Sequence, residues 1–305
     1  MKLIYKGIFG SHLYGTNNEN SDLDVKQIHQ NSLEEIILKK AQNNIQKDER
    51  DEVDFESKEL RTFISSCLSG QTFSMDILFT PKHLWKMTSD TWFEIQENRS
   101  KLVTKNMGSF MAYCRGQTGK YSKKGDKLNE IIELKAILES VPSKNLLGSL
   151  FNENDQLKFE HIKIEKIYNS GSRNFETMLK VVESHHPFNR QISDVLKSIN
   201  LKIDAYGDRS KKASQNKGID LKSYYHAFRV CWEFEELLTT GELKFPSKRK
   251  DLMINMRTGV YTKSFLDHWI TEEIERIESI ENNLPEPDHK FWDNWLLEQY
   301  LKERN

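Results

Sequence analysis

The stretch that decides the fold is Gly10-Ser11-His12-Leu13-Tyr14-Gly15-Thr16, together with Ser21-Asp22-Leu23-Asp24-Val25 shortly after it. An apolar run precedes it at residues 3–9 and is long enough for one strand, which the glycine–serine pair ends. Side chains alternate between the two faces of a strand, so Asp22 and Asp24 are expected on one face, with Leu23 and Val25 turned into the core. Two carboxylates this close repel each other unless a cation neutralises them.

This pattern predicts a metal site beside a phosphate-binding loop. Proteins bind Mg²⁺ through one or two carboxylates together with substrate phosphates, which suits Asp22 and Asp24. The glycines beside Ser11 allow backbone amides to approach phosphate oxygens closely. The same sequence pattern would also fit an exposed acidic turn, because a lone Gly-Ser pair or Asp-x-Asp also occurs in unrelated proteins.

The order of an apolar strand, Gly-Ser, a short spacer and Ser-Asp-x-Asp resembles the DNA polymerase β-type nucleotidyltransferase superfamily. The chain looks closest to its RNA-repair-associated predicted nucleotidyltransferases of bacteria and phages (the RlaP/YcgL type), and Gly70-Gln71-Thr72 is part of that similarity. The resemblance implies an α+β fold. A nucleotidyltransferase domain with a small mixed sheet would occupy residues 1–100, and a mainly helical domain that contributes to nucleotide and acceptor binding would occupy residues 101–305.

The resemblance also implies a third carboxylate on a later strand, and the sequence offers two candidates. Asp76 lies in Met75-Asp76-Ile77-Leu78-Phe79-Thr80-Pro81, which we interpret as a compact apolar strand that Pro81 ends. Asp54 lies in Val53-Asp54-Phe55-Glu56, a predicted strand in a more charged neighbourhood, where a solvated edge strand explains the acids. We favour Asp76 and keep Asp54 as the alternative.

Two later regions are basic. Lys222, His226 and Arg229 fall at i, i+4 and i+7, which predicts one stripe of a helix that could face a triphosphate, or an exposed stripe paired with Glu233 and similar acids. The segment from Arg115 to Lys124 mixes basic residues with tyrosine and glycine, a pattern typical of a polyanion contact or of a solvated face. Residues 127–205 are expected to be helical, with loops near 152–155 and 169–173.

By this resemblance the chain would be a metal-dependent nucleotidyltransferase, which moves a nucleoside monophosphate from a nucleoside triphosphate to a hydroxyl and releases pyrophosphate. Asp22, Asp24 and Asp76 would hold two Mg²⁺ ions, with Mn²⁺ as an alternative ion. The expected nucleotide-binding residues come from the glycine loop and the helical stripe: Gly10, Ser11, Tyr14, Gly15, Ser21, Lys222, His226 and Arg229.

By family analogy the acceptor would be an RNA end, such as a damaged tRNA, with an RNA ligase as a further partner. A protein hydroxyl or a small molecule would be an alternative acceptor. The basic stretches at 120–127 and 211–217 favour a polyanion over a cationic small molecule. A non-catalytic nucleotide- or RNA-binding module is the third hypothesis, disfavoured because all candidate carboxylates are present.

Composition limits the other classes. The 305 residues carry 45 lysines and arginines against 46 acids, so any polyanion site must be a local patch rather than a global field. Three widely spaced cysteines (Cys67, Cys114 and Cys231) form no metal-binding pattern and suit a reducing compartment. No apolar run approaches the ~20 residues of a membrane span. We therefore expect no membrane partner and a cytoplasmic location in a bacterial or phage-infected cell.

Overall fold

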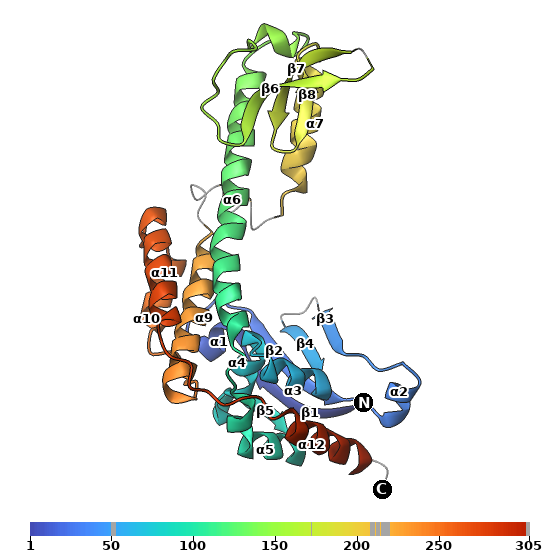
Figure 1. Ribbon diagram of the computed structural model, residues 1–305, viewed down its shortest axis with the longest axis vertical. Helices are drawn as coiled ribbons and strands as arrows, with labels where there is room; N and C mark the ends of the chain where they lie inside the picture. The colour runs from blue at the N-terminus through green and yellow to red at the C-terminus, as the bar shows by residue number, and fades with distance from the viewer. Residues whose placement is uncertain (50–52, 172, 208–210, 212–213, 215–219, 303–305) are drawn as a thin grey trace. The chain divides into compact units, whose positions relative to one another are not determined.

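The chain is described here from a computed structural model, which forms two compact units. It describes residues 1–49, 53–171, 173–207, 211, 214 and 220–302, and only the backbone at 46–49, 53, 54, 117–124 and 169. The first unit comprises Met1–Gln117 and Tyr224–Asn305, and the second comprises Thr118–Ser223. The chain enters the second unit along α6 (Gly108–Glu139) and leaves it at the start of α9 (Leu221–Thr240), as Figure 1 shows.

A mixed five-stranded sheet organises the first unit, in the order β3-β4-β2-β1-β5. β2 and β4 are parallel, and the other neighbours are antiparallel. The buried side chains of β1 pack on an aromatic centre in which the rings of Tyr5 and Trp92 stack at 4.1 Å. The strands are β1 (Lys2–Ile8), β2 (Leu23–Gln30), β3 (Asn44–Glu49), β4 (Val53–Glu59) and β5 (Trp85–Thr88).

Helices cover this sheet and continue to the C-terminus. α3 packs against β2 and β4, and α5 packs against β1. Glu59 begins α3 as its cap, since its carboxylate accepts the backbone N–H groups of Arg61 and Thr62. The helices of this unit, besides α6 and α9, are α1 (Gly10–Tyr14), α2 (Leu33–Ile37), α3 (Leu60–Leu68), α4 (Thr72–Leu78), α5 (Asp90–Glu97), α10 (Lys250–Arg257), α11 (Lys263–Glu278) and α12 (His289–Lys302), with 3-10 turns at Lys82–Leu84 and Arg99–Leu102.

The strand predicted around Asp76 is wrong. Residues Thr72–Leu78 form α4, whose side chains from Ser74 to Leu78 are all buried. A short apolar run that is buried on every side reads the same as a strand or as a helix, so periodicity could not separate the two. Gly70, at a φ of +64°, ends α3 and turns the chain into this second short helix.

The second unit contains a sheet that the sequence analysis did not predict. β6 (Ile162–Asn169), β7 (Asn174–Val181) and β8 (Ser184–Pro187) form an antiparallel sheet in that order. The core of this unit lies between the sheet, α6 and α7 (Ile192–Ala205), and a 3-10 turn lies at Leu147–Ser149. The helical expectation for residues 127–205 is therefore wrong for 162–187, where Ile162 and Ile164 alternate with Lys163 and Glu165 as a strand requires.

The α+β class is confirmed, with a mixed N-terminal sheet followed by mostly helical sequence. The two units differ from the expected division at residue 100, because the C-terminal helices return to the unit that holds the first sheet. Within the described part of the chain, no helix is long and apolar enough to cross a membrane.

Candidate functional site

The glycine loop and the first aspartates meet at the end of β1. The backbone N–H of Phe9 donates to the carbonyl of Asp24 at 2.9 Å, which fixes the chain as it turns from β1 into α1. Gly10 follows with a φ of +63°, and a Cβ atom there would lie 1.7 Å from Oδ2 of Asp24. The glycine is thus required twice, for its backbone conformation and for the close approach of the Asp24 carboxylate.

We expect Gly10→Ala to damage the fold and the site together. The left-handed conformation costs a non-glycine residue about 1–2 kcal/mol, and the new methyl group must displace the Asp24 carboxylate. Urea denaturation should show the loss of unfolding free energy. Gly116→Ala is the matched control, because nothing lies within 4 Å of a Cβ at that position in α6 and alanine favours a helix. Equal stability of the two variants would contradict the requirement for glycine at position 10.

The structure does not bring the three predicted metal ligands together. Asp22 is exposed just before β2, and Asp24 is half-buried within it. Of the side chains that the structure describes, no three His, Cys, Asp or Glu residues gather closely enough to hold a metal ion, so Asp76 does not join Asp22 and Asp24. The register of β2 and β4 instead sets Asp54 directly opposite Asp24 on the neighbouring parallel strand. The side chain of Asp54 lies outside the described part.

Asp76 is occupied inside the protein. Its side chain is 1% exposed, and its Oδ2 accepts hydrogen bonds from the hydroxyl of Tyr14 at 2.7 Å and from Nη1 of Arg229 at 2.8 Å. A buried carboxylate needs such partners, because burying an unpaired charge is very costly. The prediction of Asp76 as a metal ligand is therefore corrected: this carboxylate holds two other elements of the fold together.

Arg229 links three other side chains, and we call the four together the buried charge cluster: Tyr14, Asp76, Arg229 and Glu233. Its Nη1 also donates to both carboxylate oxygens of Glu233, at 2.7 and 2.9 Å, and its guanidinium lies 4.2 Å from the centre of the Tyr14 ring. The predicted triphosphate contact of Arg229 is thus replaced by internal ion pairs. The reason is that α9 is buried almost all round from Ser223 to Phe234, so its charges must find partners inside.

The cluster holds two carboxyl groups on one guanidinium. Burial raises the pKa of Glu233 well above its ordinary value of 4.5, and burial also raises the pKa of Asp76, against the opposing effect of Arg229. A single arginine compensates one negative charge fully, so protonation of one carboxyl relieves the repulsion between them. The direction that we expect for both groups is upward.

We therefore expect stability to fall as the pH rises. A carboxyl whose pKa is raised in the folded state binds protons better when folded, so its stabilising effect is complete below its unfolded pKa and is lost as the pH rises through the folded value. Between about pH 5 and pH 8, Glu233→Gln should show a flatter change of unfolding free energy with pH than the wild type. The exposed Glu298→Gln is the control, and a Glu233→Gln profile parallel to the wild type would refute the effect.

The other predicted nucleotide-binding residues lie in different surroundings. Gly15 ends α1 at a φ of +71°, and a Cβ there would meet Pro246 at 2.6 Å. The Ser21 hydroxyl accepts the backbone N–H of Asn18 at 2.8 Å, and His226 is half-buried in α9. Lys222 is exposed in the second unit, so the predicted stripe is divided between the two units.

Basic residues that the prediction missed lie against the glycine loop. Nη1 of Arg257 donates to the carbonyl of Thr16 at 3.2 Å, and Cδ of Lys250 would lie 3.6 Å from a Cβ on Gly15. Lys250 and Arg257 are the first and last residues of α10. The connection before this helix, Lys244-Phe245-Pro246-Ser247-Lys248-Arg249, concentrates positive charge. This density of basic residues is visible in the sequence, but only the fold shows that it lies near the glycine loop.

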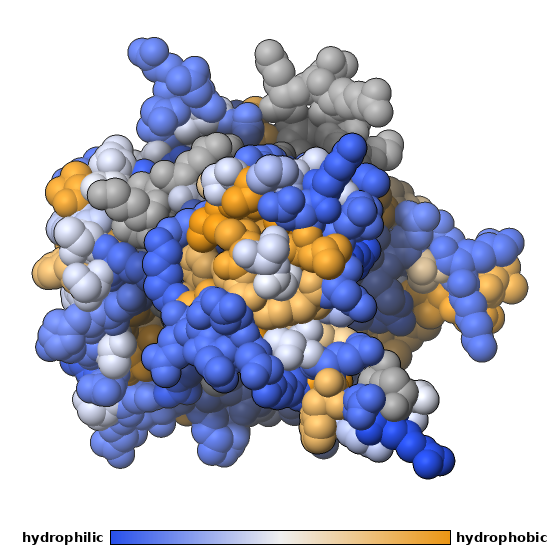
Figure 2. Space-filling view, turned by 90° about the horizontal axis from the view of Figure 1, so that it is seen from above, coloured by the Kyte–Doolittle hydropathy of each residue, from blue (hydrophilic) through white to orange (hydrophobic). Residues whose placement is uncertain are grey.

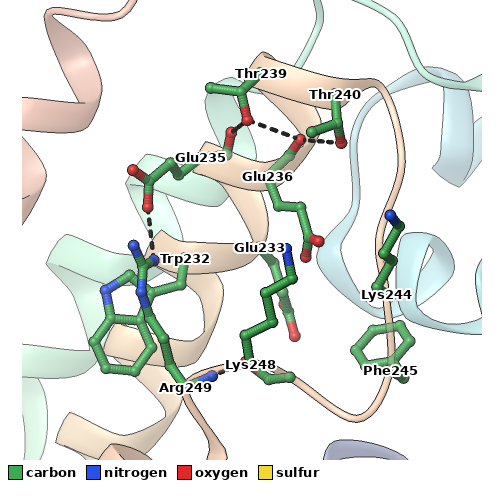
Figure 3. Close-up of a pocket in the computed structure, with 11 residues that line it drawn as sticks. Trp232, Glu233, Glu235, Glu236, Thr239, Thr240, Lys244, Phe245, Lys248 and Arg249 are labelled. Carbon is green, nitrogen blue, oxygen red and sulfur yellow. Dashed lines mark hydrogen bonds and ion pairs between the residues drawn. The ribbon is translucent and has the colours of Figure 1, made fainter.

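A cavity of about 230 Å³ opens on the same connection. Figure 3 shows Lys244 at the right with the ring of Phe245 below it, Glu236 on α9, and Lys248 alongside Glu233. The Phe245 ring also contacts Tyr14, with the ring centres 5.9 Å apart. The cavity thus belongs to the same region of the first unit as the glycine loop, and exposed lysines line its rim.

The sequence is similar to one known family and to one phage protein. The sequence model of a family described as the RNA repair pathway DNA polymerase beta family (RlaP) matches residues 1–138, which include the glycine loop, Asp24 and β4. An "uncharacterized 38.9 kDa protein in nrdC-mobD intergenic region" of Enterobacteria phage T4 is 28% identical over 333 residues, covering 99% of this chain and 98% of the relative. No solved structure matches the chain. The resemblance predicted from the N-terminal residues is confirmed.

Proposed function

Because residues 1–138 match the RNA repair pathway DNA polymerase beta family, we propose that the chain is a metal-dependent nucleotidyltransferase that acts on an RNA end. It would transfer a nucleoside monophosphate from a nucleoside triphosphate to a hydroxyl group and release pyrophosphate. The observation that carries the proposal is the packing of Gly10 on the Asp24 carboxylate, with Asp54 in register on the next strand.

The residues fit a hard divalent cation. Asp22 and Asp24 offer carboxylate oxygens at the start of β2, and the missing side chain of Gly10 leaves room at Oδ2 of Asp24. Mg²⁺ prefers carboxylate and phosphate oxygens, and Mn²⁺ accepts the same ligands. When bound here, the ion would neutralise the triphosphate and lower the pKa of the acceptor hydroxyl. We assign Asp22, Asp24 and Asp54 as its ligands.

The chain's own residues would position the reactants. The Gly10–Ser11 turn allows the triphosphate to approach the backbone closely, and Lys250 and Arg257 beside the loop supply positive charge. The acceptor oxygen would attack the α-phosphorus as the bond to pyrophosphate breaks, and a carboxylate at position 54 would accept the hydroxyl proton. Such chemistry depends chiefly on alignment and charge neutralisation.

The proposal is tested by incubating the full chain with Mg²⁺, each labelled nucleoside triphosphate in turn, and RNAs that end in a free 3′ hydroxyl. We expect label to enter RNA, to be lost when EDTA removes the metal, and to be absent with Asp24→Asn. A parallel panel of protein and small-molecule acceptors tests the other hydroxyl acceptors. Equal labelling by wild type and Asp24→Asn, or triphosphate binding with no transfer to any acceptor, would exclude the proposed activity.

A further inference from the structure

The β6–β7 hairpin of the second unit carries two aromatic rings into solvent. Tyr168 and Phe175 face each other across the two strands, and their ring centres are 5.4 Å apart. Tyr168 is 55% exposed and Phe175 is 69% exposed. We call this pair the hairpin tip. Aromatic rings so placed lose the stabilisation that burial gives, because about 25 cal/mol is gained for each Å² of apolar surface removed from water.

The core of the second unit does not include the tip. On the same face of the hairpin, Ile162 pairs with Val181 and Ile164 pairs with Leu179, and these four side chains pack with α6 and α7. One further pair, Lys166 and Thr177, separates them from the tip. The hairpin therefore continues beyond the core, and its last aromatic pair is available to a partner.

The charge around the tip favours a polyanion. The second unit carries 19 lysines and arginines against 14 acids, whereas the first carries 26 against 32. Arg173 in the hairpin turn is exposed, and it forms no ion pair with a residue that the structure describes. A nearly neutral chain thus keeps its excess positive charge in the unit that exposes the aromatic pair.

A groove beside the hairpin adds groups that can recognise bases. It has a volume of about 410 Å³ and borders Thr177 of β7. Phe151 and Phe188 supply apolar surface in it, and Asn152 and Asn189 supply amide donors and acceptors. Glu153 and Glu176 also line it, and their carboxylates can accept hydrogen bonds from the amino groups of bases. Figure 2 shows apolar side chains gathered among hydrophilic ones on one face of the protein.

We propose that the hairpin tip and this groove bind an unpaired stretch of RNA, the class of acceptor assigned under the proposed function, on which this inference rests. Unpaired bases stack on exposed aromatic rings, and basic side chains hold the phosphates between them. A base paired in a duplex has no free face to offer, so single-stranded RNA is the form that this surface selects. A protein partner would use the rings without the need for the surrounding positive charge.

The test is binding of a fluorescent single-stranded 12-mer RNA and of its duplex to the full chain, by anisotropy without metal or triphosphate. We expect Tyr168→Ala with Phe175→Ala to weaken single-strand binding about 10- to 100-fold, as the loss of stacking on one or two bases predicts. Leu201→Ala is the matched control, since Leu201 on α7 is 72% exposed in the same unit. Arg173→Ala should reduce the slope of the logarithm of the binding constant against the logarithm of the salt concentration by about one.

The outcomes separate this inference from the proposed activity. If the wild type transfers no nucleotide but binds the RNA through the tip, the activity fails and the inference stands. If the double variant binds the 12-mer as tightly as the wild type, or if the wild type does not bind it, the inference is overturned. Sedimentation checks the remaining partner: a wild-type oligomer that dissociates in the double variant, with unchanged RNA binding, would identify the tip as a contact between copies of this chain.

Discussion

Asp54→Asn is expected to lower nucleotidyl transfer by about 100-fold or more while the protein stays folded. Position 54 is in register with Asp24 on the parallel strand β4, so the change removes a charge next to the proposed metal site. Asparagine keeps the shape of the side chain but is a neutral ligand and a poor proton acceptor. Single-turnover transfer with saturating Mg²⁺, compared with circular dichroism and urea denaturation of the same sample, measures both expected results.

Asp76→Asn is the matched control, since the sequence alone favoured that residue for the same role. The amide oxygen can still accept the Tyr14 hydroxyl, but the ion pair with Arg229 is lost. We expect a loss of about 1–3 kcal/mol in unfolding free energy, with transfer per folded molecule close to that of the wild type. The reverse pattern, with Asp76→Asn inactive and stable and Asp54→Asn active, would restore the original assignment of the third carboxylate.

The N-terminal site was predictable because its signal is local. Gly10, Ser11, Asp22 and Asp24 lie within a short stretch, and strand alternation with glycine conformation suffices to predict that the glycine turn and the aspartates lie together. The structure shows the close approach of Gly10 to Asp24, and the role of these residues in binding metal and phosphate stays a prediction. The α+β class followed from the family resemblance that this stretch carries.

The third carboxylate was not predictable in the same way. Choosing between Asp54 and Asp76 requires the partner of β2, and strand pairing depends on the whole sheet rather than on neighbours in sequence. The charged surroundings of Asp54 suggested an edge strand, yet β4 lies inside the sheet between β3 and β2. Its charges have local partners, such as the ion pair of Lys26 with Glu56 at 2.6 Å.

The prediction of a basic stripe facing a triphosphate went wrong for a related reason. The spacing of His226 and Arg229 correctly set them on one helix, but spacing cannot say whether that side of the helix faces water. The expected pairing with Glu233 is present, though buried rather than exposed. The strands between residues 162 and 187 were likewise not predicted. Their alternation of apolar and polar residues covers only a few positions, and the segment lies between two helices, α6 and α7.

Arg229→Met should give the largest loss of stability, about 3–5 kcal/mol, because it leaves Asp76 and Glu233 buried without their cation. The cation contact with Tyr14, the last residue of α1, is lost as well. Urea denaturation at about pH 8 should show the full effect, and at about pH 5 the deficit should shrink as the two carboxyls take up protons.

Two comparisons assign this loss to the buried charges rather than to the removal of any arginine. Arg276→Met breaks ion pairs with Glu235 and Glu273 on the surface and is expected to cost at most about 1 kcal/mol. Adding Glu233→Leu to Arg229→Met removes one stranded carboxylate, so the double variant should be more stable than Arg229→Met alone. If the second change only adds to the first, the cluster is not held by its charges, and the link that it makes from α9 to Tyr14 must depend on packing.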